Sequence, residues 1–388
     1  MKYAAESLLS PFNFILPTSI RYGMGVVNSL PGELVTKGHR NVLVISDGGV
    51  AGLPFFAAVL HSLKADSLKV EVFKNVEANP KDGNVQKAAD AARTINADCI
   101  VAIGGGSPID CAKAASIVAV QGGNVRDYEG GNNINNDPLP IYTVPTTAGT
   151  GSEITFSAVI TDSAEKHKFT VKTPAIAPKI SFVDPELTIS VPPDITASTG
   201  LDALTHAIEA YTAKNAEPIS DAAALYAIEL ISHYLITAVK DGNNKKARAG
   251  MLSGSLLAGI AFSHADVASV HCLAEALGGL YDVPHGVCNA ITLPVVMEYN
   301  TEYAAERYAR IASAMGISFS DPAEGAKKAV EKVIELVKDA GLPSFRSLGV
   351  EESHFETIAE KSACNGSNGS NPRPMKKSDY IKLLKLLL

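Results

Sequence analysis

The stretch "CIVAIGGGSPIDCAKAASIVAVQ", residues 99–121, indicates the class of the fold. It starts as a continuous apolar run (99–105), turns on three glycines, and continues with apolar residues at helical spacing (107–121). A continuous apolar strand is typical of a parallel sheet that helices cover on both faces. We expect Ser107 to cap the helix and Pro108 to occupy its first position.

Strand and helix alternate on both sides of this stretch, and the pattern changes near residue 185. The first half predicts strands at 41–46, 68–76, 140–147 and 179–185, helices at 53–64 and 82–96, and a hairpin of 154–162 with 167–174. The second half has helical spacing at 197–213, 219–240, 243–263, 301–316 and 321–341. We therefore predict an α/β dinucleotide-binding domain with a parallel, Rossmann-like sheet at 1–185 and an all-α domain at 186–388.

Composition excludes several classes of protein. The 388 residues carry 34 basic and 41 acidic side chains without a basic block, which argues against nucleic-acid binding. Five cysteines without C-x-x-C spacing favour a reducing, cytoplasmic compartment. The N-terminus lacks the long apolar region of a signal peptide, and we read no apolar run of about 20 residues that would span a membrane.

Two loops that follow predicted strands are suited to bind a pyrophosphate. Glycines at 104–106 let a ligand approach the backbone, and the helix that follows presents free N–H groups to an anion. The stretch departs from G-x-G-x-x-G because Ile109 occupies the third glycine position. The second loop, "TVPTTAGTGSE" (143–153), brings hydroxyls to the same edge of the sheet. The first loop alone is equally compatible with an ordinary glycine-rich turn, and the second could be a polar turn that leads to the hairpin. Two such loops after parallel strands in one domain are harder to dismiss than one.

Asp47 ends the first predicted strand in "ISDGG". A carboxylate there could accept a hydrogen bond from a ribose hydroxyl and would repel a 2′-phosphate. A turn-forming aspartate before Gly48 explains the same letters equally well.

Ligand-type side chains gather in the second half of the chain. "GLDALTHAIEAY" places Asp202 and His206 four residues apart, hence on one helix face. "SVHCLAEALGGLYDVPHG" adds His271 on a helix and His285 after an expected Gly-Gly turn. One carboxylate and three imidazoles suit a divalent cation such as Fe²⁺ or Zn²⁺. From spacing alone, a hydrogen-bonded Asp–His pair and a turn histidine are the commoner explanation.

Taken together, these motifs resemble the iron-containing, group III alcohol dehydrogenases, the family that includes lactaldehyde reductases and 1,3-propanediol dehydrogenases. The resemblance covers nearly the whole chain, from "FNFILPTSIRYGMGVVNSLPG" through "GGGSPIDCAKA" and "PTTAGTGSE" to "GLDALTHAIEAY" and "PHGVCNAITLP". It implies a dehydroquinate synthase-like architecture with the active site between the domains. It also implies a cytoplasmic homo-oligomer that acts on a small alcohol or aldehyde.

The resemblance also implies roles for individual residues. The metal, Fe²⁺ before Zn²⁺, would be held by Asp202, His206, His271 and His285. The cofactor, NAD rather than NADP, would contact Asp47, Asn79, Gly104, Gly105, Gly106, Ser107, Thr146, Thr147, Ser152 and Lys168. Phe262 would line the substrate wall.

One position departs from the family pattern. Many relatives carry a second histidine four residues after the position of His271, where this chain has Glu275. Glu275 could take up a proton, hold a hydroxyl-rich or amine substrate, or orient His271. We predict a metal-dependent, NAD(P)-linked alcohol dehydrogenase or aldehyde reductase. Alternatives are a polyol or hydroxy-acid dehydrogenase on the same scaffold, a dehydroquinate synthase-like lyase, a metal hydrolase without nucleotide, and a nucleotide-binding regulatory protein without turnover.

Overall fold

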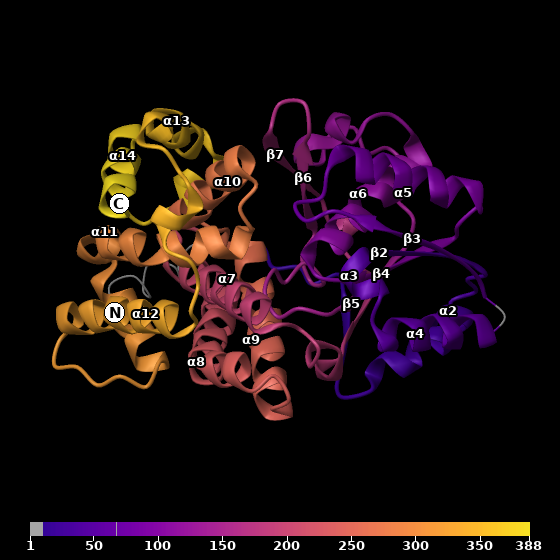
Figure 1. The fold of residues 1–388 in the computed structure, drawn as a ribbon, viewed down its shortest axis with the longest axis horizontal. Helices are drawn as coiled ribbons and strands as arrows, with labels where there is room; N and C mark the ends of the chain where they lie inside the picture. Colours follow the sequence, from indigo (N-terminus) through magenta and orange to yellow (C-terminus); the bar gives the residue numbers. More distant parts are fainter. Residues whose placement is uncertain (1–10, 67) are drawn as a thin grey trace. The chain divides into compact units, whose positions relative to one another are not determined.

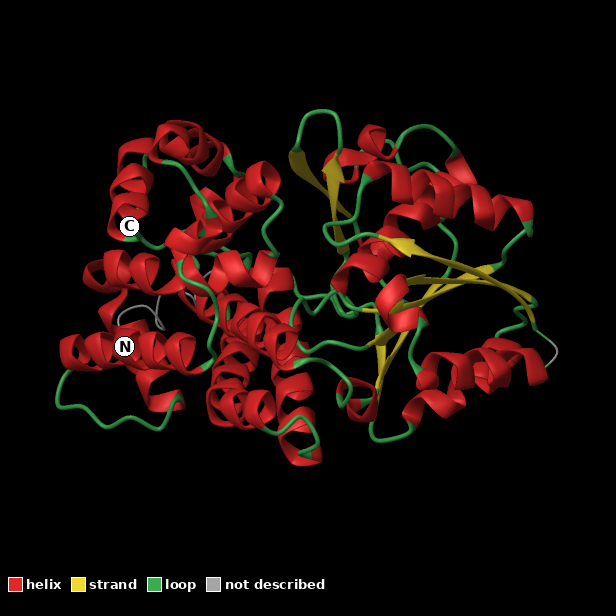
Figure 2. Ribbon diagram, viewed as in Figure 1, coloured by secondary structure: helices red, strands yellow, loops and turns green. Residues whose placement is uncertain are grey.

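The computed structural model describes residues 11–66 and 68–388, and the chain divides into two compact units (Figures 1 and 2). The α/β unit comprises residues 16–147 and 152–190, and the helical unit comprises residues 11–15, 148–151 and 191–388. The chain thus enters the helical unit for its C-terminal part shortly after the predicted boundary at 185. Residues 1–10, on which the signal-peptide expectation partly rests, lie outside the described residues.

A parallel sheet forms the centre of the α/β unit. Within the described residues its strands run in the order β1(Ser19–Tyr22), β8(Ile180–Val183), β5(Ile141–Pro145), β4(Cys99–Gly104), β2(Asn41–Asp47) and β3(Lys69–Val76). All neighbouring pairs are parallel. A separate antiparallel hairpin joins β6(Ser157–Asp162) to β7(His167–Lys172). The predicted strands and hairpin are confirmed.

Helices cover both faces of this sheet because both faces of its strands are apolar. Successive strand residues point to opposite faces, so Leu43 and Ile45 pack in one core while Val42 and Val44 pack in another. Helices α5 and α6 share the first core, and α2 and α4 share the second (Figure 1). The helix bounds are α2(Leu30–Thr36), α3(Gly48–Ala51), α4(Pro54–Ala65), α5(Asp82–Thr94) and α6(Gly106–Gln121).

The start of α6 differs from the prediction. The N-cap is Gly105, which makes no side-chain capping bond, and the helix begins at Gly106. Ser107 is therefore not the cap but a residue of the first turn, and Pro108 follows it there. Proline is tolerated in this turn because the first N–H groups of a helix have no intrahelical acceptor, so its missing N–H costs no hydrogen bond.

The helical unit packs its long helices around one core, as the sequence predicts. Its α-helices in the described residues are α7(Pro193–Thr212), α8(Pro218–Lys240), α9(Lys245–Ala265), α10(Ser269–Tyr281), α11(His285–Ala314), α12(Pro322–Asp339), α13(Phe355–Cys364) and α14(Lys377–Leu386). Helix α8 is long and apolar enough to cross a membrane by composition. The buried face of α8 packs in this core with α7 and α9, and 33% of its apolar window is buried.

The expected Gly-Gly turn before His285 is wrong. Helix α10 continues through Gly278 and ends at Tyr281, and Asp282 terminates it in the left-handed conformation with φ of 52°. Tertiary packing overrides the weak helix propensity of glycine here. His285 is then the first residue of α11, and Pro284 is its N-cap. Because a helix sets the directions of its side chains, the start of α11 determines where the His285 side chain points.

All five cysteines lie in the described part of the chain, and none forms a disulfide. Cys99, Cys111, Cys272 and Cys288 are buried, where cysteine behaves as a small apolar residue.

Candidate active site

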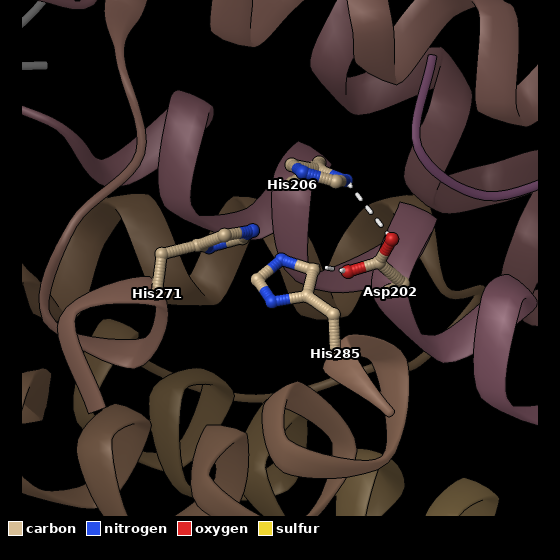
Figure 3. Close-up of side chains that lie close together, drawn as sticks. All are labelled: Asp202, His206, His271 and His285. Carbon is tan, nitrogen blue, oxygen red and sulfur yellow. Dashed lines mark ion pairs between the residues drawn. The ribbon is translucent and has the colours of Figure 1, made fainter. Parts of the chain in front are cut away.

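Four ligand-type side chains converge in the helical unit (Figure 3). Asp202 and His206 lie on consecutive turns of α7, His271 on α10, and His285 at the start of α11. One ligand atom from each side chain lies within 4.8 Å of all the others. The structure therefore brings together all four residues that the sequence singled out for metal binding.

The cluster is buried and electrostatically matched. Asp202, His206 and His271 are at most 5% exposed. Burial alone would raise the pKa of Asp202, but the three imidazoles and an Asn289 hydrogen bond outweigh it and lower this pKa. Burial lowers the pKa of His206 to about 4. A carboxylate and a neutral imidazole are the protonation states that coordinate a metal.

The donor set passes a direct test for a cation site. His206 Nδ1 is buried, has no hydrogen-bond partner among the described residues, and lies 3.9 Å from Asp202 Oδ2. Buried polar atoms are normally hydrogen-bonded, so an unpaired nitrogen that faces a carboxylate requires an explanation. A divalent ion that accepts its lone pair supplies one. Nitrogen and carboxylate donors in this number suit Fe²⁺ or Zn²⁺.

Asn289 closes the cluster from α11, one turn after His285. Its Nδ2 lies 2.6 Å from Asp202 Oδ1, and 3.1 Å from both His271 Nε2 and His285 Nε2. An amide nitrogen has two hydrogens, so it cannot donate to three acceptors at once. Asn289 was not predicted from the sequence, although its spacing of four residues from His285 marks it as a neighbour on the same helix face.

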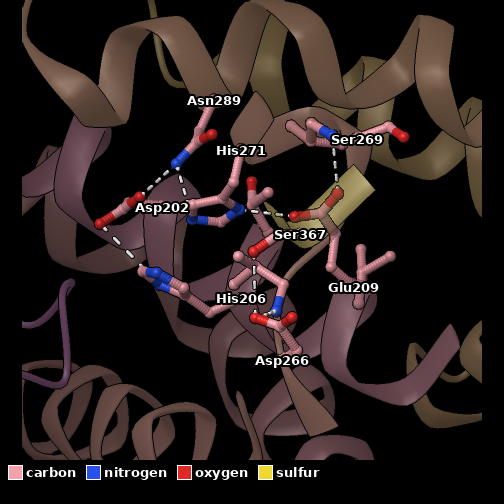
Figure 4. Close-up of polar contacts among 12 residues, drawn as sticks. Asp202, His206, Glu209, Asp266, Ser269, His271, Asn289 and Ser367 are labelled. Atoms are coloured by element: carbon pink, nitrogen blue, oxygen red, sulfur yellow. Dashed lines mark hydrogen bonds and ion pairs between the residues drawn. The ribbon is translucent and has the colours of Figure 1, made fainter. Parts of the chain in front are cut away.

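Glu209 supports His271 from the other side (Figure 4). Its Oε2 accepts a hydrogen bond from His271 Nδ1 at 2.5 Å, and its Oε1 accepts one from the Val270 backbone N–H at 2.7 Å. Burial would lower the pKa of His271, but the Glu209 hydrogen bond and charge raise it. Sequence reasoning also missed this residue, which follows His206 by three positions on α7.

Two further residues that the sequence analysis named lie beside the cluster. The ring of Phe262 stacks on His206, with centroids 4.3 Å apart and an interplanar angle of 17°. Glu275 follows His271 by one helical turn, and its Oε2 accepts a hydrogen bond from Asn365 Nδ2 at 2.5 Å. Asn365 opens the segment "NGSNGS" (365–370) and caps its 3-10 helix, so this segment contacts Glu275.

The predicted cofactor residues belong to the α/β unit, and several converge at the carboxyl ends of its strands. Gly104 pairs with Pro145 across β4 and β5. It has φ of +154°, and a Cβ there would lie 2.7 Å from Pro108 Cγ and 3.3 Å from Asp47 Oδ2. A Cβ on Gly105 would lie 3.1 Å from Thr147 Oγ1. Position 104 therefore accepts only glycine. The short distances also show that Asp47, the glycine turn and Thr147 lie close together.

The remaining cofactor candidates have defined surroundings. Lys168 Nζ donates to Asn79 Oδ1 at 2.8 Å, which joins two residues far apart in sequence. Thr146 extends the strand edge, because its backbone N–H donates to Gly104 O at 3.0 Å. Ser152 is buried and its hydroxyl contacts Asp110 and Lys113. Asp110 and Lys113 lie on α6, the helix that follows the glycine turn, so Ser152 connects the two predicted cofactor loops.

A second group of ligand-type residues consists of His39, Asp98 and Cys99. His39 Nε2 is hydrogen-bonded to Tyr142 OH at 2.8 Å, and His39 Nδ1 lies 3.3 Å from Asp98 Oδ1. Asp98 Oδ2 accepts from two backbone N–H groups at the start of β2. This network accounts for the positions of His39 and Asp98 without an ion, so the cluster around Asp202 is the candidate metal centre.

A parallel α/β unit with a glycine turn at its strand ends, and a cage of Asp202, His206, His271 and His285 buried in the helical unit, are the features expected of a metal-dependent dinucleotide oxidoreductase. Comparison with known proteins specifies the family. Residues 17–185 match the model of the iron-containing alcohol dehydrogenases, and residues 196–388 match that of the C-terminal part of the same family. The chain belongs to the iron-containing alcohol dehydrogenase family.

Individual relatives agree with this assignment. The chain is 41% identical to the 1,3-propanediol dehydrogenase of Klebsiella pneumoniae over 93% of this chain and 95% of that protein. It is 36% identical to the NAD-dependent methanol dehydrogenase of Bacillus methanolicus over 96% of this chain and 99% of that protein. A crystal structure of a 1,3-propanediol oxidoreductase matches with a TM-score of 0.95 and 38% identity, and covers 98% of this chain and 100% of that one. The chain is therefore an iron-containing alcohol dehydrogenase by family, and the hydrolase alternative is set aside.

Proposed function

We propose that this protein interconverts small primary alcohols and their aldehydes with NAD, and that a ferrous ion bound by Asp202, His206, His271 and His285 is required. The overall reaction takes a hydride from the carbinol carbon to NAD⁺ and releases the hydroxyl proton, which leaves an aldehyde and NADH. The observation that carries the proposal is the buried cluster of four donor atoms within 4.8 Å of one another.

A divalent ion in this cluster supplies Lewis acidity, which favours loss of the hydroxyl proton from an alcohol and polarises an aldehyde carbonyl. The chain's own residues hold and shape the site. Asp202 contributes the negative charge, and Asn289 fixes its Oδ1. Phe262 packs flat on His206 and shields that imidazole with an apolar surface.

We propose that Glu275 accepts the released proton. Its carboxylate is partly exposed and lies one helical turn beyond His271. Asn365 donates to Oε2, which leaves Oε1 to receive a proton or a hydrogen bond from substrate. A carboxylate here also favours alcohols that carry a second hydroxyl or an amine, in place of negatively charged ones. This is the specific observation that supports a polyol substrate as the second candidate.

We propose that the α/β unit holds the cofactor. The glycine turn and the first N–H groups of α6 would bind the pyrophosphate, because a helix N-terminus attracts anions. Thr146, Thr147 and Ser152 would line the nicotinamide side, Asn79 and Lys168 would contact the cofactor, and Asp47 would favour NAD over NADP. A homo-oligomer is also proposed, since β1 forms an edge of the sheet and is mostly exposed.

The test combines metal analysis with turnover. Protein purified without added metal is analysed for bound elements, and NADH oxidation is then followed over a panel of small aldehydes. We expect about one divalent ion per chain, activity that a chelator abolishes and Fe²⁺ restores, and loss of both in Asp202→Asn. Full activity in metal-free protein, or in that variant, would refute the proposal.

A further inference from the structure

Glu209 is a buried carboxylate that is not among the proposed ligands. It lies on α7 and is 3% exposed. Both of its oxygens are used, one by His271 Nδ1 and the other by the Val270 backbone N–H. A buried carboxylate is costly unless such donors satisfy it, so this position is strongly constrained.

The contact determines which ring nitrogen of His271 carries the hydrogen. An ionised carboxylate only accepts hydrogen bonds, so Nδ1 must carry the hydrogen of the bond that Glu209 Oε2 accepts. In a neutral imidazole, Nε2 then bears the lone pair. Nε2 is also the nitrogen that lies 3.1 Å from Asn289 Nδ2, the atom in contact with Asp202 and His285. The lone pair of His271 is thus directed into the cage.

We infer that Glu209 is a positioning residue that fixes the tautomer and ring orientation of His271 and thereby sets how tightly the cage binds a divalent cation. The inference rests on the proposed metal site, which it deepens. Carboxylates that orient a ligating histidine in this way typically contribute 10- to 100-fold to metal affinity. The second bond, to Val270 N–H, anchors the carboxylate itself, because Val270 precedes His271 at the start of α10.

A purely structural role is the alternative. Glu209 connects α7 to the first turn of α10, and any residue that bridges two helices contributes to stability. The two roles predict different results. A bridge would affect unfolding alone, whereas a positioning residue would affect cation affinity beyond any effect on unfolding.

Glu209→Gln tests the inference with little change of shape. Glutamine has one carbonyl oxygen and one NH₂ group, so it cannot accept hydrogen bonds at both positions. The matched control is Glu217→Gln. Glu217 is also buried, and its two oxygens accept the backbone N–H groups of Ile219 and Ser220 at the start of α8, without contact to the cage.

Dissociation constants for Zn²⁺ and Co²⁺ are measured by competition with a chromophoric chelator, and unfolding temperatures are measured in parallel. We expect both variants to unfold at lower temperature, Glu209→Gln to bind both ions 10- to 100-fold more weakly than wild type, and Glu217→Gln to bind them within about threefold of it. Equal affinities in the two variants would overturn the inference.

A measurement on the wild-type protein keeps the inference testable if Glu209→Gln does not fold. In Zn²⁺-loaded protein with ¹⁵N-labelled histidine, long-range ¹H–¹⁵N correlation should show His271 protonated at Nδ1. Protonation at Nε2 would overturn the inference. Failure of wild-type protein to bind Zn²⁺ or Co²⁺ would instead refute the proposed metal site, so the two failures are distinguishable.

Discussion

Replacement of Gly286 by alanine should disable the cage although it substitutes none of the four proposed ligands. Gly286 is the second residue of α11, directly after His285. A Cβ there would lie 2.4 Å from the backbone oxygen and 2.8 Å from the carbonyl carbon of Ser198 on α7. Ordinary carbon–oxygen contacts are about 3.3 Å or longer, so the start of α11 must retreat from α7 by roughly 1 Å.

That displacement would carry His285 away from Asp202, which α7 holds. Metal–ligand distances tolerate deviations of only about 0.2 Å, so a retreat of this size removes His285 from coordination. Misplacement of a reacting group by about 1 Å commonly costs about 100-fold in rate. We therefore expect kcat/KM to fall about 100-fold and the dissociation constant for the metal to rise by a similar factor. Overpacking should also cost about 1–3 kcal/mol of stability.

Steady-state kinetics with NAD and a small alcohol, metal competition and thermal unfolding measure these three effects. Gly83→Ala is the matched control, since Gly83 is also the second residue of its helix and a Cβ there would meet nothing within 4 Å. It should keep activity and be unchanged or slightly more stable. If Gly286→Ala binds metal and turns over like wild type, our account of how α11 places His285 is wrong.

Three further changes test other parts of the chain. Asp47→Ser should raise the ratio of NADP to NAD activity at least tenfold by removing a charge that repels a 2′-phosphate, measured as kcat/KM for each cofactor; an unchanged ratio would contradict this role. Asn365→Ala should raise KM for 1,3-propanediol about tenfold and that for 1-propanol less, because it releases Glu275; equal effects would contradict it. Burial raises the pKa of Glu153 from its ordinary value of 4.5 to about 7. The free energy of unfolding of the wild-type protein should therefore fall as the pH rises from 4.5 to 7, because unfolding then lets the buried carboxyl ionise. The free energy of unfolding of Glu153→Gln, measured with denaturant, should therefore rise by up to about 3 kcal/mol relative to that of wild type between pH 4.5 and 7. A difference between the two proteins that stays constant with pH would contradict the raised pKa of Glu153.

The sequence predicted the strands β2, β4, β5 and β8 closely because each is a buried apolar run between turn residues, whereas β1, α2 and α3 were not predicted. The predicted strand at 41–46 and helix at 82–96 lie within two residues of β2 and α5. The errors fall where packing decides. The helix α10 runs through two glycines because neighbouring helices bury it, and no local rule reports that burial. Helices α13 and α14 were not predicted at all.

The ligand set could be predicted from the sequence, whereas the residues that support it could not. Asp, His and their spacing have recognisable chemistry, and the resemblance to a family placed them. Glu209 and Asn289 are ordinary helix residues by composition. Their importance appears only once α7, α10 and α11 are packed, because each contacts a ligand on another helix. Contacts between elements do not follow from the spacing within one element.

One spacing nevertheless recurs on all three helices of the cage. Two residues one helical turn apart face the cage on α7 (202 and 206), and α10 and α11 repeat the spacing with ligand His271 before Glu275 and ligand His285 before Asn289. Each helix therefore presents a ligand and a second polar group on one face. The ligands contact residues of other helices, namely Glu209 for His271 and Asn289 for Asp202. Because each of these contacts joins two helices, a displacement of one helix also disturbs residues on another. A single methyl group at position 286, which displaces the start of α11, should therefore weaken metal binding.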